Sequence, residues 1–151
     1  IAYQTLKGGT YLDITLGKVA GAIPVLQQIK NKKPSFKIDY WVMRNIKLYA
    51  DSYNFFIQKR EEIFEKYCNK VKNEAAPEGS YYTLDKNGTI QFNLKPGICN
   101  EDFQKDMDEL MKMPCDDIAP YKLSLDVINN SGNFNLDNED DIFAIDYLLS
   151  E

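Results

Sequence analysis

The hydrophobic pattern is most regular over residues 36–72, where large apolar side chains recur at the spacing of a helix. One face collects the apolar residues Ile38, Val42, Ile46, Tyr49, Tyr53, Phe56, Phe64, Tyr67 and Val71. The opposite face carries the charged residues Lys47, Asp51, Glu61, Glu62 and Glu65. This pattern predicts one long amphipathic helix. Trp41, Leu48 and Phe55 widen its apolar face on one side, so we expect the helix to contact more than one neighbour.

Two elements are predicted before this helix. Apolar and polar residues alternate over residues 12–16, which predicts a short strand. Apolar residues then recur at helical spacing over residues 19–29, which predicts a helix. Pro24 interrupts this second pattern, so the helix either begins near Ile23, with the proline in its first turn, or is kinked at Pro24.

The second half of the chain alternates between strand and helix patterns. Alternating apolar residues flank the turn Asp85-Lys86-Asn87-Gly88, which predicts a hairpin over residues 82–94. A helix is predicted over residues 100–113, a strand over residues 121–127, and a final helix capped by Asp137. The sum is an α+β fold, in which the long helix and about three further helices pack on a small antiparallel sheet that contains the β-hairpin. We expect residues 1–151 to form a single domain.

Charge is sorted along the chain. Residues 1–72 hold 13 lysine and arginine residues against 6 aspartate and glutamate residues, a net charge of +7. Residues 73–151 hold 5 against 17, a net charge of −12. This asymmetry favours a protein that binds through one basic and one acidic surface. Copies of the chain could associate head to tail and close into a ring, although the two halves could equally pair within one chain.

The residue types restrict catalysis. The chain has no histidine, which excludes the Ser-His-Asp and Cys-His catalytic arrangements and histidine-ligated zinc. The three cysteines form no Cys-x-x-Cys pair and are expected to be free thiols. Asp116 and Asp117 could take part in metal-assisted hydrolysis, but acidic loops are usually only solvated. A loop from Asn133 lacks the glycine and glutamate of a calcium loop. We expect no catalytic, cofactor-binding or metal-binding residues.

Charge and hydropathy also bear on two further classes of partner, nucleic acid and the membrane. The basic residues 30–37 suggest contact with phosphate. The isoelectric point of about 4.8 and the acidic residues on the long helix argue against nucleic acid as the partner. No apolar run approaches the roughly 20 residues that span a bilayer, so we expect no membrane contact.

Several short patterns follow one another in a recognisable order. They are Lys32-Lys33-Pro34, a helix end with Glu61, Glu62, Lys66 and Tyr67, the turn from Asp85 to Gly88, Pro120-Tyr121-Lys122-Leu123, and Leu136 before Asp137 to Asp141. In this order the chain resembles a family of small uncharacterised proteins encoded by tailed phages. It departs from that family in residues 1–20 and around Trp41. The resemblance implies a phage protein without a known catalytic site, located in the virion or in the cytoplasm of the bacterial host.

Our first hypothesis is therefore a non-enzymatic phage protein that acts through protein–protein contacts, as a structural or assembly component of the virion. The alternative is a small inhibitor that binds a host defence or nucleic-acid-handling enzyme through its acidic C-terminal half. The partner would be a virion protein, a host enzyme or, in a homo-oligomer, another copy of the chain. A third hypothesis, that the chain is a small metal-dependent enzyme, ranks behind these two. The predicted partner-binding residues are Trp41, Phe55, Arg60, Glu139, Asp140 and Asp141. Arg60 lies within the apolar stripe, so its stem could instead rest on apolar surface with the guanidinium in water.

Overall fold

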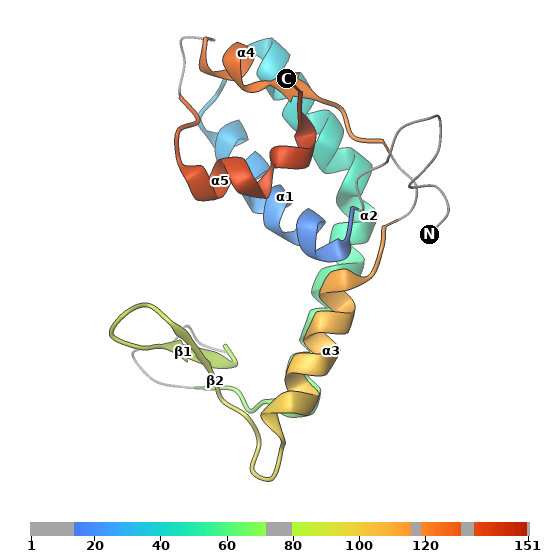
Figure 1. Cartoon of the computed structure of the whole chain (residues 1–151), viewed down its shortest axis with the longest axis vertical. Coiled ribbons are helices and arrows are strands. Elements are labelled where there is room, and N and C mark those ends of the chain that lie inside the picture. Colours follow the sequence, from blue (N-terminus) through green and yellow to red (C-terminus); the bar gives the residue numbers. More distant parts are fainter. Residues whose placement is uncertain (1–13, 72–79, 116–118, 131–134, 151) are drawn as a thin grey trace. The chain divides into compact units, whose positions relative to one another are not determined.

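The computed structural model describes residues 14–71, 80–115, 119–130 and 135–150 (Figure 1). The helices are α1 (Leu16–Asn31), α2 (Phe36–Tyr67), α3 (Asn100–Lys112), α4 (Leu125–Asn129) and α5 (Glu139–Ala144), followed by a short 3-10 helix, Asp146–Leu148. Strands β1 (Tyr82–Leu84) and β2 (Ile90–Phe92) pair antiparallel, and strands β3 (Leu123–Ser124) and β4 (Leu149–Ser150) pair parallel. The fold is α+β, and the predictions of a long helix and of a hairpin are confirmed.

The contacts divide the chain into two compact units. The first unit combines Ile1–Phe56 with Met111–Glu151, and the second comprises Ile57–Leu110. Helix α2 contributes its first part to the first unit and its last part to the second. A single domain over the whole chain therefore stays a prediction.

Helix α1 begins earlier than the sequence pattern indicates. The side chain of Thr15 caps it by accepting a hydrogen bond from the backbone N–H of Lys18, so Leu16 is helical and not part of a strand. Pro24 lies inside the helix on its exposed side, so the predicted start near Ile23 is wrong. Residues 12 and 13 of the predicted strand lie outside the described residues. Thr15 instead forms an isolated antiparallel bridge with Pro114.

The buried face of α2 follows the predicted stripe. Ile38, Val42 and Tyr49 are almost fully buried in the first unit, where the buried side of α1 supplies further core residues. The helix ends at Tyr67 and not at residue 72, because the chain beyond it pairs with the segment after β2. Cys68 forms a β-bridge with Leu94, and the Tyr67 carbonyl accepts a hydrogen bond of 2.8 Å from the Lys95 N–H.

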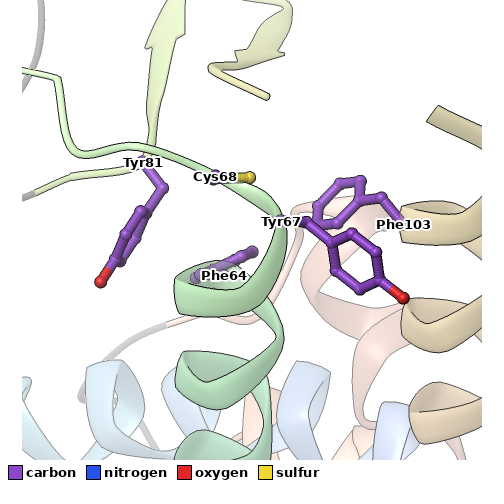
Figure 2. Close-up of a cluster of buried hydrophobic side chains, with 5 residues drawn as sticks. All are labelled: Phe64, Tyr67, Cys68, Tyr81 and Phe103. Carbon is purple, nitrogen blue, oxygen red and sulfur yellow. The ribbon is translucent and has the colours of Figure 1, made fainter. Parts of the chain in front are cut away.

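The core of the second unit is aromatic. Figure 2 shows a cluster of five buried residues in this core, of which Phe64 and Tyr67 come from α2 and Phe103 from α3, with Cys68 just after α2 and Tyr81 just before β1. The rings of Phe64 and Tyr81 lie 5.4 Å apart, and those of Tyr67 and Phe103 lie 5.8 Å apart, between centroids. These contacts hold the end of α2, the hairpin and α3 together within this unit.

Two predictions for the C-terminal part are wrong in detail. The predicted strand over residues 121–127 is reduced to β3, because the Ser124 side chain caps α4 by accepting from the Val127 N–H, and residues 125–129 are helical. The cap of α5 is Asn138 and not Asp137: the Asn138 side-chain oxygen accepts from the Asp141 N–H at 3.1 Å. Phe143 of this helix is 84% exposed.

Candidate interaction surfaces

The two aromatic residues expected to form one flank of α2 have different surroundings. Trp41 is only 4% exposed, and its indole N–H donates a hydrogen bond of 2.9 Å to the Tyr121 carbonyl. Phe55, on the same helix, is exposed. They are 14 residues apart, which corresponds to about 21 Å along the helix axis. The structure therefore places Trp41 in the core of the first unit and does not bring it together with Phe55.

Arg60 lies in the second unit and is half-buried. Its guanidinium carbon is 5.8 Å from the centre of the Phe64 ring, at a cation–π distance. This contact places the guanidinium group beside an aromatic ring of the second unit. A role for Arg60 in partner binding stays a prediction.

Residues 137–143, here called the acidic segment, form an anionic surface on the first unit. Glu139 and Asp140 are exposed and Asp141 is half-buried, all in the first turn of α5. Among the residues that the structure describes, neither Glu139 nor Asp140 has an ion-pair partner. The largely exposed ring of Phe143 stands four residues after Glu139, and so on the same side of this short helix. Exposed aromatic rings are typical of binding surfaces, and the carboxylates beside this ring supply negative charge that a basic partner would complement.

The other side of the acidic segment lines a pocket. Its polar lining includes Asp137, Asn138 and Asp141, Gln28 of α1, and Lys32 just after that helix. Val25, Ile29 and Leu136 are among its apolar lining residues, and its volume is about 260 Å³. Both signs of charge line this pocket, because Lys32 is among the lining residues together with Asp137 and Asp141. The carboxylates of Glu139 and Asp140 are not part of the lining.

A cationic cluster that the sequence patterns did not single out lies on the exposed face of α2. Arg44 donates hydrogen bonds through Nη1 to the Tyr40 hydroxyl and through Nη2 to the Tyr121 hydroxyl. Its guanidinium carbon also lies 4.2 Å from the centre of the Tyr121 ring and 5.2 Å from that of Tyr40. The hydrogen bond to Tyr121 has the largest effect and that to Tyr40 the next largest, and both raise the pKa of Arg44 above its usual value. The side chain therefore stays cationic. We call Tyr40, Arg44 and Tyr121 the Arg44 cluster.

A buried amide fixes the position of Tyr121. Asn45 is fully buried, and its side chain bonds both backbone groups of Tyr121: Nδ2 donates to the carbonyl at 2.9 Å, and Oδ1 accepts from the N–H at 3.1 Å. The Trp41 indole donates to the same carbonyl. Both polar groups of the Asn45 amide are thus satisfied inside the first unit, as a buried amide requires. The arrangement anchors the Tyr121 loop to α2.

The exposed face of α2 around this cluster is more apolar than an amphipathic pattern predicts. Phe36 is 94% exposed and Tyr40 62% exposed, and Met43 is exposed beside them. The spacing of four residues between Tyr40 and Arg44 is a sequence signal that could have indicated a pair on one helix face. Nothing in the spacing indicates Tyr121, which reaches Arg44 across 77 residues of chain.

One polar contact stands out in the second unit. The Tyr67 hydroxyl donates a hydrogen bond of 2.7 Å to Asp106, and the ammonium group of Lys66 lies 3.6 Å from the same carboxylate. The hydrogen bond from Tyr67, followed by the charge of Lys66, lowers the pKa of Asp106 below its usual value. The contact joins the end of α2 to α3 and leaves Asp106 ionised at neutral pH.

The described ranges hold neither a cluster suited to a metal ion nor a membrane-spanning helix. Within these ranges no three residues of the types His, Cys, Asp or Glu lie close enough to hold a metal ion. None of the described helices combines the length and the apolar character needed to cross a membrane. Comparison with protein-family models, with curated proteins and with solved structures gave no match.

Proposed function

We propose that this chain is a non-enzymatic protein that acts through protein–protein contacts and associates with further copies of itself through oppositely charged surfaces. As part of the same proposal, the chain has a structural or assembly role in a phage particle, one of two roles that its sequence resemblance to the tailed-phage family favours, the other being a small protein that binds a host factor. One observation carries the proposal, namely the sorting of charge within the first unit. Residues 16–50 contain seven lysine and arginine residues and one acidic residue, whereas residues 135–150 contain five acidic residues and no cation.

Pairing of these charges within one chain would weaken the proposal, since it would neutralise both surfaces. In the described part of the chain, however, Lys37, Arg44 and Lys47 make no ion pair with a carboxylate, and neither do Glu139 and Asp140. Unpaired charges of opposite sign on one unit are complementary between two copies. The exposed rings of Phe36 and Phe143 supply apolar area that charged surfaces alone would lack.

The test is reversal of the acidic segment. The variant with Glu139→Lys, Asp140→Lys and Asp141→Lys should remain folded by circular dichroism but lose self-association in sedimentation velocity at low salt. The matched control reverses three exposed carboxylates of α3, namely Asp102, Asp108 and Glu109, and so changes the net charge by the same amount. The control should associate like the wild type. Equal loss in both variants would refute the acidic segment as the contact.

A second candidate function is favoured by the exposure of the acidic segment. Exposed carboxylates around an exposed ring could equally enter a basic groove on another protein, which corresponds to the inhibitor hypothesis. The two candidates differ in one result. Under the inhibitor hypothesis we expect one chain mass at every salt concentration, and the acidic reversal should abolish binding to the target without changing that mass.

A further inference from the structure

The Arg44 cluster holds more hydrogen-bond donors than it uses. A guanidinium has five N–H groups, and Arg44 spends two of them on the hydroxyls of Tyr40 and Tyr121. Each hydroxyl accepts from the arginine, so its own hydrogen is left to donate elsewhere. The cluster therefore offers three N–H and two O–H donors around one positive charge. No acidic side chain of the described residues pairs with Arg44.

The cluster is also held in place before any ligand binds. The two hydrogen bonds and the two ring contacts restrict the Arg44 side chain, and Asn45 fixes the backbone of Tyr121. Ordering a flexible side chain upon association costs free energy, and a pre-ordered arginine avoids most of that cost. A solvated lysine such as Lys47 on the same helix has no comparable support.

A planar fork of donors with a fixed positive charge selects an oxyanion, because guanidinium groups bind carboxylates and phosphates with two parallel hydrogen bonds. The chain itself displays such groups. Glu139 and Asp140 are exposed carboxylates without an ion-pair partner among the described residues, and the exposed Phe143 follows them. On the other surface the exposed Phe36 precedes Tyr40 by one turn of α2. The acidic segment thus has negative charge next to the exposed ring of Phe143, and the Arg44 cluster has positive charge next to the exposed ring of Phe36.

We propose that the Arg44 cluster is a carboxylate-binding site whose occupant is the acidic segment of a second copy of this chain. A carboxylate of Glu139 or Asp140 accepts hydrogen bonds from Arg44 and from the two tyrosine hydroxyls. Phe143 of the same copy lies against Phe36. This inference rests on the proposed self-association and specifies its contact.

The experiment is a charge exchange in the full-length chain. Sedimentation velocity at low salt compares the wild type with Arg44→Glu, with Glu139→Arg and Asp140→Arg singly, and with each of these two combined with Arg44→Glu. We expect Arg44→Glu to weaken self-association about tenfold or more, as for a close interfacial charge pair. One of the combined variants should restore most of the loss. Circular dichroism checks that each variant is folded.

Two matched variants separate the cluster from charge alone. Lys47→Glu makes the same charge change on the same helix face, outside the cluster, and should cost clearly less than Arg44→Glu. Tyr121→Phe removes one hydroxyl donor without changing charge, and should weaken association measurably. Equal effects of Lys47→Glu and Arg44→Glu, or the absence of rescue by both combined variants, would overturn the carboxylate site while leaving charge-driven self-association intact.

A wild type that remains monomeric would overturn the second copy as occupant, and a peptide then tests the site itself. The probe is a labelled synthetic peptide with the sequence of residues 137–145, titrated with the full-length protein and followed by fluorescence anisotropy. Binding that is lost in Arg44→Glu would retain the carboxylate site and refute only the self-association. The absence of peptide binding, or binding that Arg44→Glu leaves unchanged, would overturn the site as well.

Discussion

The amide of Asn45 should be the most sensitive polar position of the first unit. The change Asn45→Ala removes a fully buried side chain that holds both backbone groups of Tyr121. The Tyr121 carbonyl would keep the indole hydrogen bond from Trp41, whereas the Tyr121 N–H would lose its partner. The loop at Tyr121 would therefore loosen, and with it one tyrosine of the Arg44 cluster.

The magnitude follows from these contacts. An orphaned donor costs about 1–3 kcal/mol, and Tyr121 is partly exposed, so water can replace some of what is lost. The space vacated by the buried side chain adds a cost of about 1 kcal/mol. We expect Asn45→Ala to lower the free energy of unfolding by about 2–3 kcal/mol.

The assay is equilibrium unfolding in urea. Trp41 is the only tryptophan and belongs to the first unit, so its fluorescence reports on that unit. The matched control is Asn54→Ala, an exposed asparagine on the same helix, which should change the free energy of unfolding by no more than about 0.5 kcal/mol. An Asn45 variant as stable as the Asn54 variant would refute the role of this amide as the anchor of Tyr121.

Three further predictions concern the second unit. Phe103→Ala should cost about 3–5 kcal/mol, measured by urea unfolding with circular dichroism, because Phe103 is fully buried in the aromatic cluster; a cost below about 1 kcal/mol would contradict that core. The pKa of Asp106 is lowered mainly by the Tyr67 hydrogen bond, so its stabilisation is present above its unfolded-state pKa and is lost as pH falls through its folded-state pKa. Tyr67→Phe should raise the pKa of Asp106 in an NMR titration, and an unchanged value would contradict the assignment. The exposed Cys99 should react with a maleimide in the folded protein much faster than the buried Cys68, whose pKa is raised by burial, and equal rates by mass spectrometry would contradict this burial.

The fold was predictable where periodicity and local capping agree. Six residues of the predicted stripe are buried, namely Ile38, Val42, Tyr49, Phe56, Phe64 and Tyr67. The hairpin turn closes as Asp85 and Gly88 require, with Gly88 at φ +80°. Prediction failed where a side-chain cap outweighed the hydrophobic pattern. Ser124 converts an alternating segment into α4, because one capped turn satisfies backbone groups that a lone strand would leave unpaired.

The candidate site was predictable only in part. The acidic residues Glu139 and Asp140 could be named from composition, and the structure leaves them exposed. Trp41 was expected at a surface because it widens the apolar face of the helix, but it is buried and its indole N–H donates to the Tyr121 carbonyl. The Arg44 cluster depends on a contact between α2 and a distant loop, and a pairing of that kind leaves no periodic signal in the sequence.

The measurement that tests self-association most directly is the mass of the wild-type chain in solution. Size exclusion with multi-angle light scattering would be run at 0.01 M and 1 M salt, where the Debye lengths are about 30 Å and about 3 Å. The account predicts a defined multiple of the 17.4 kDa chain mass at the lower salt concentration and the single-chain mass at the higher one. A mass of one chain at both salt concentrations would contradict association through oppositely charged surfaces.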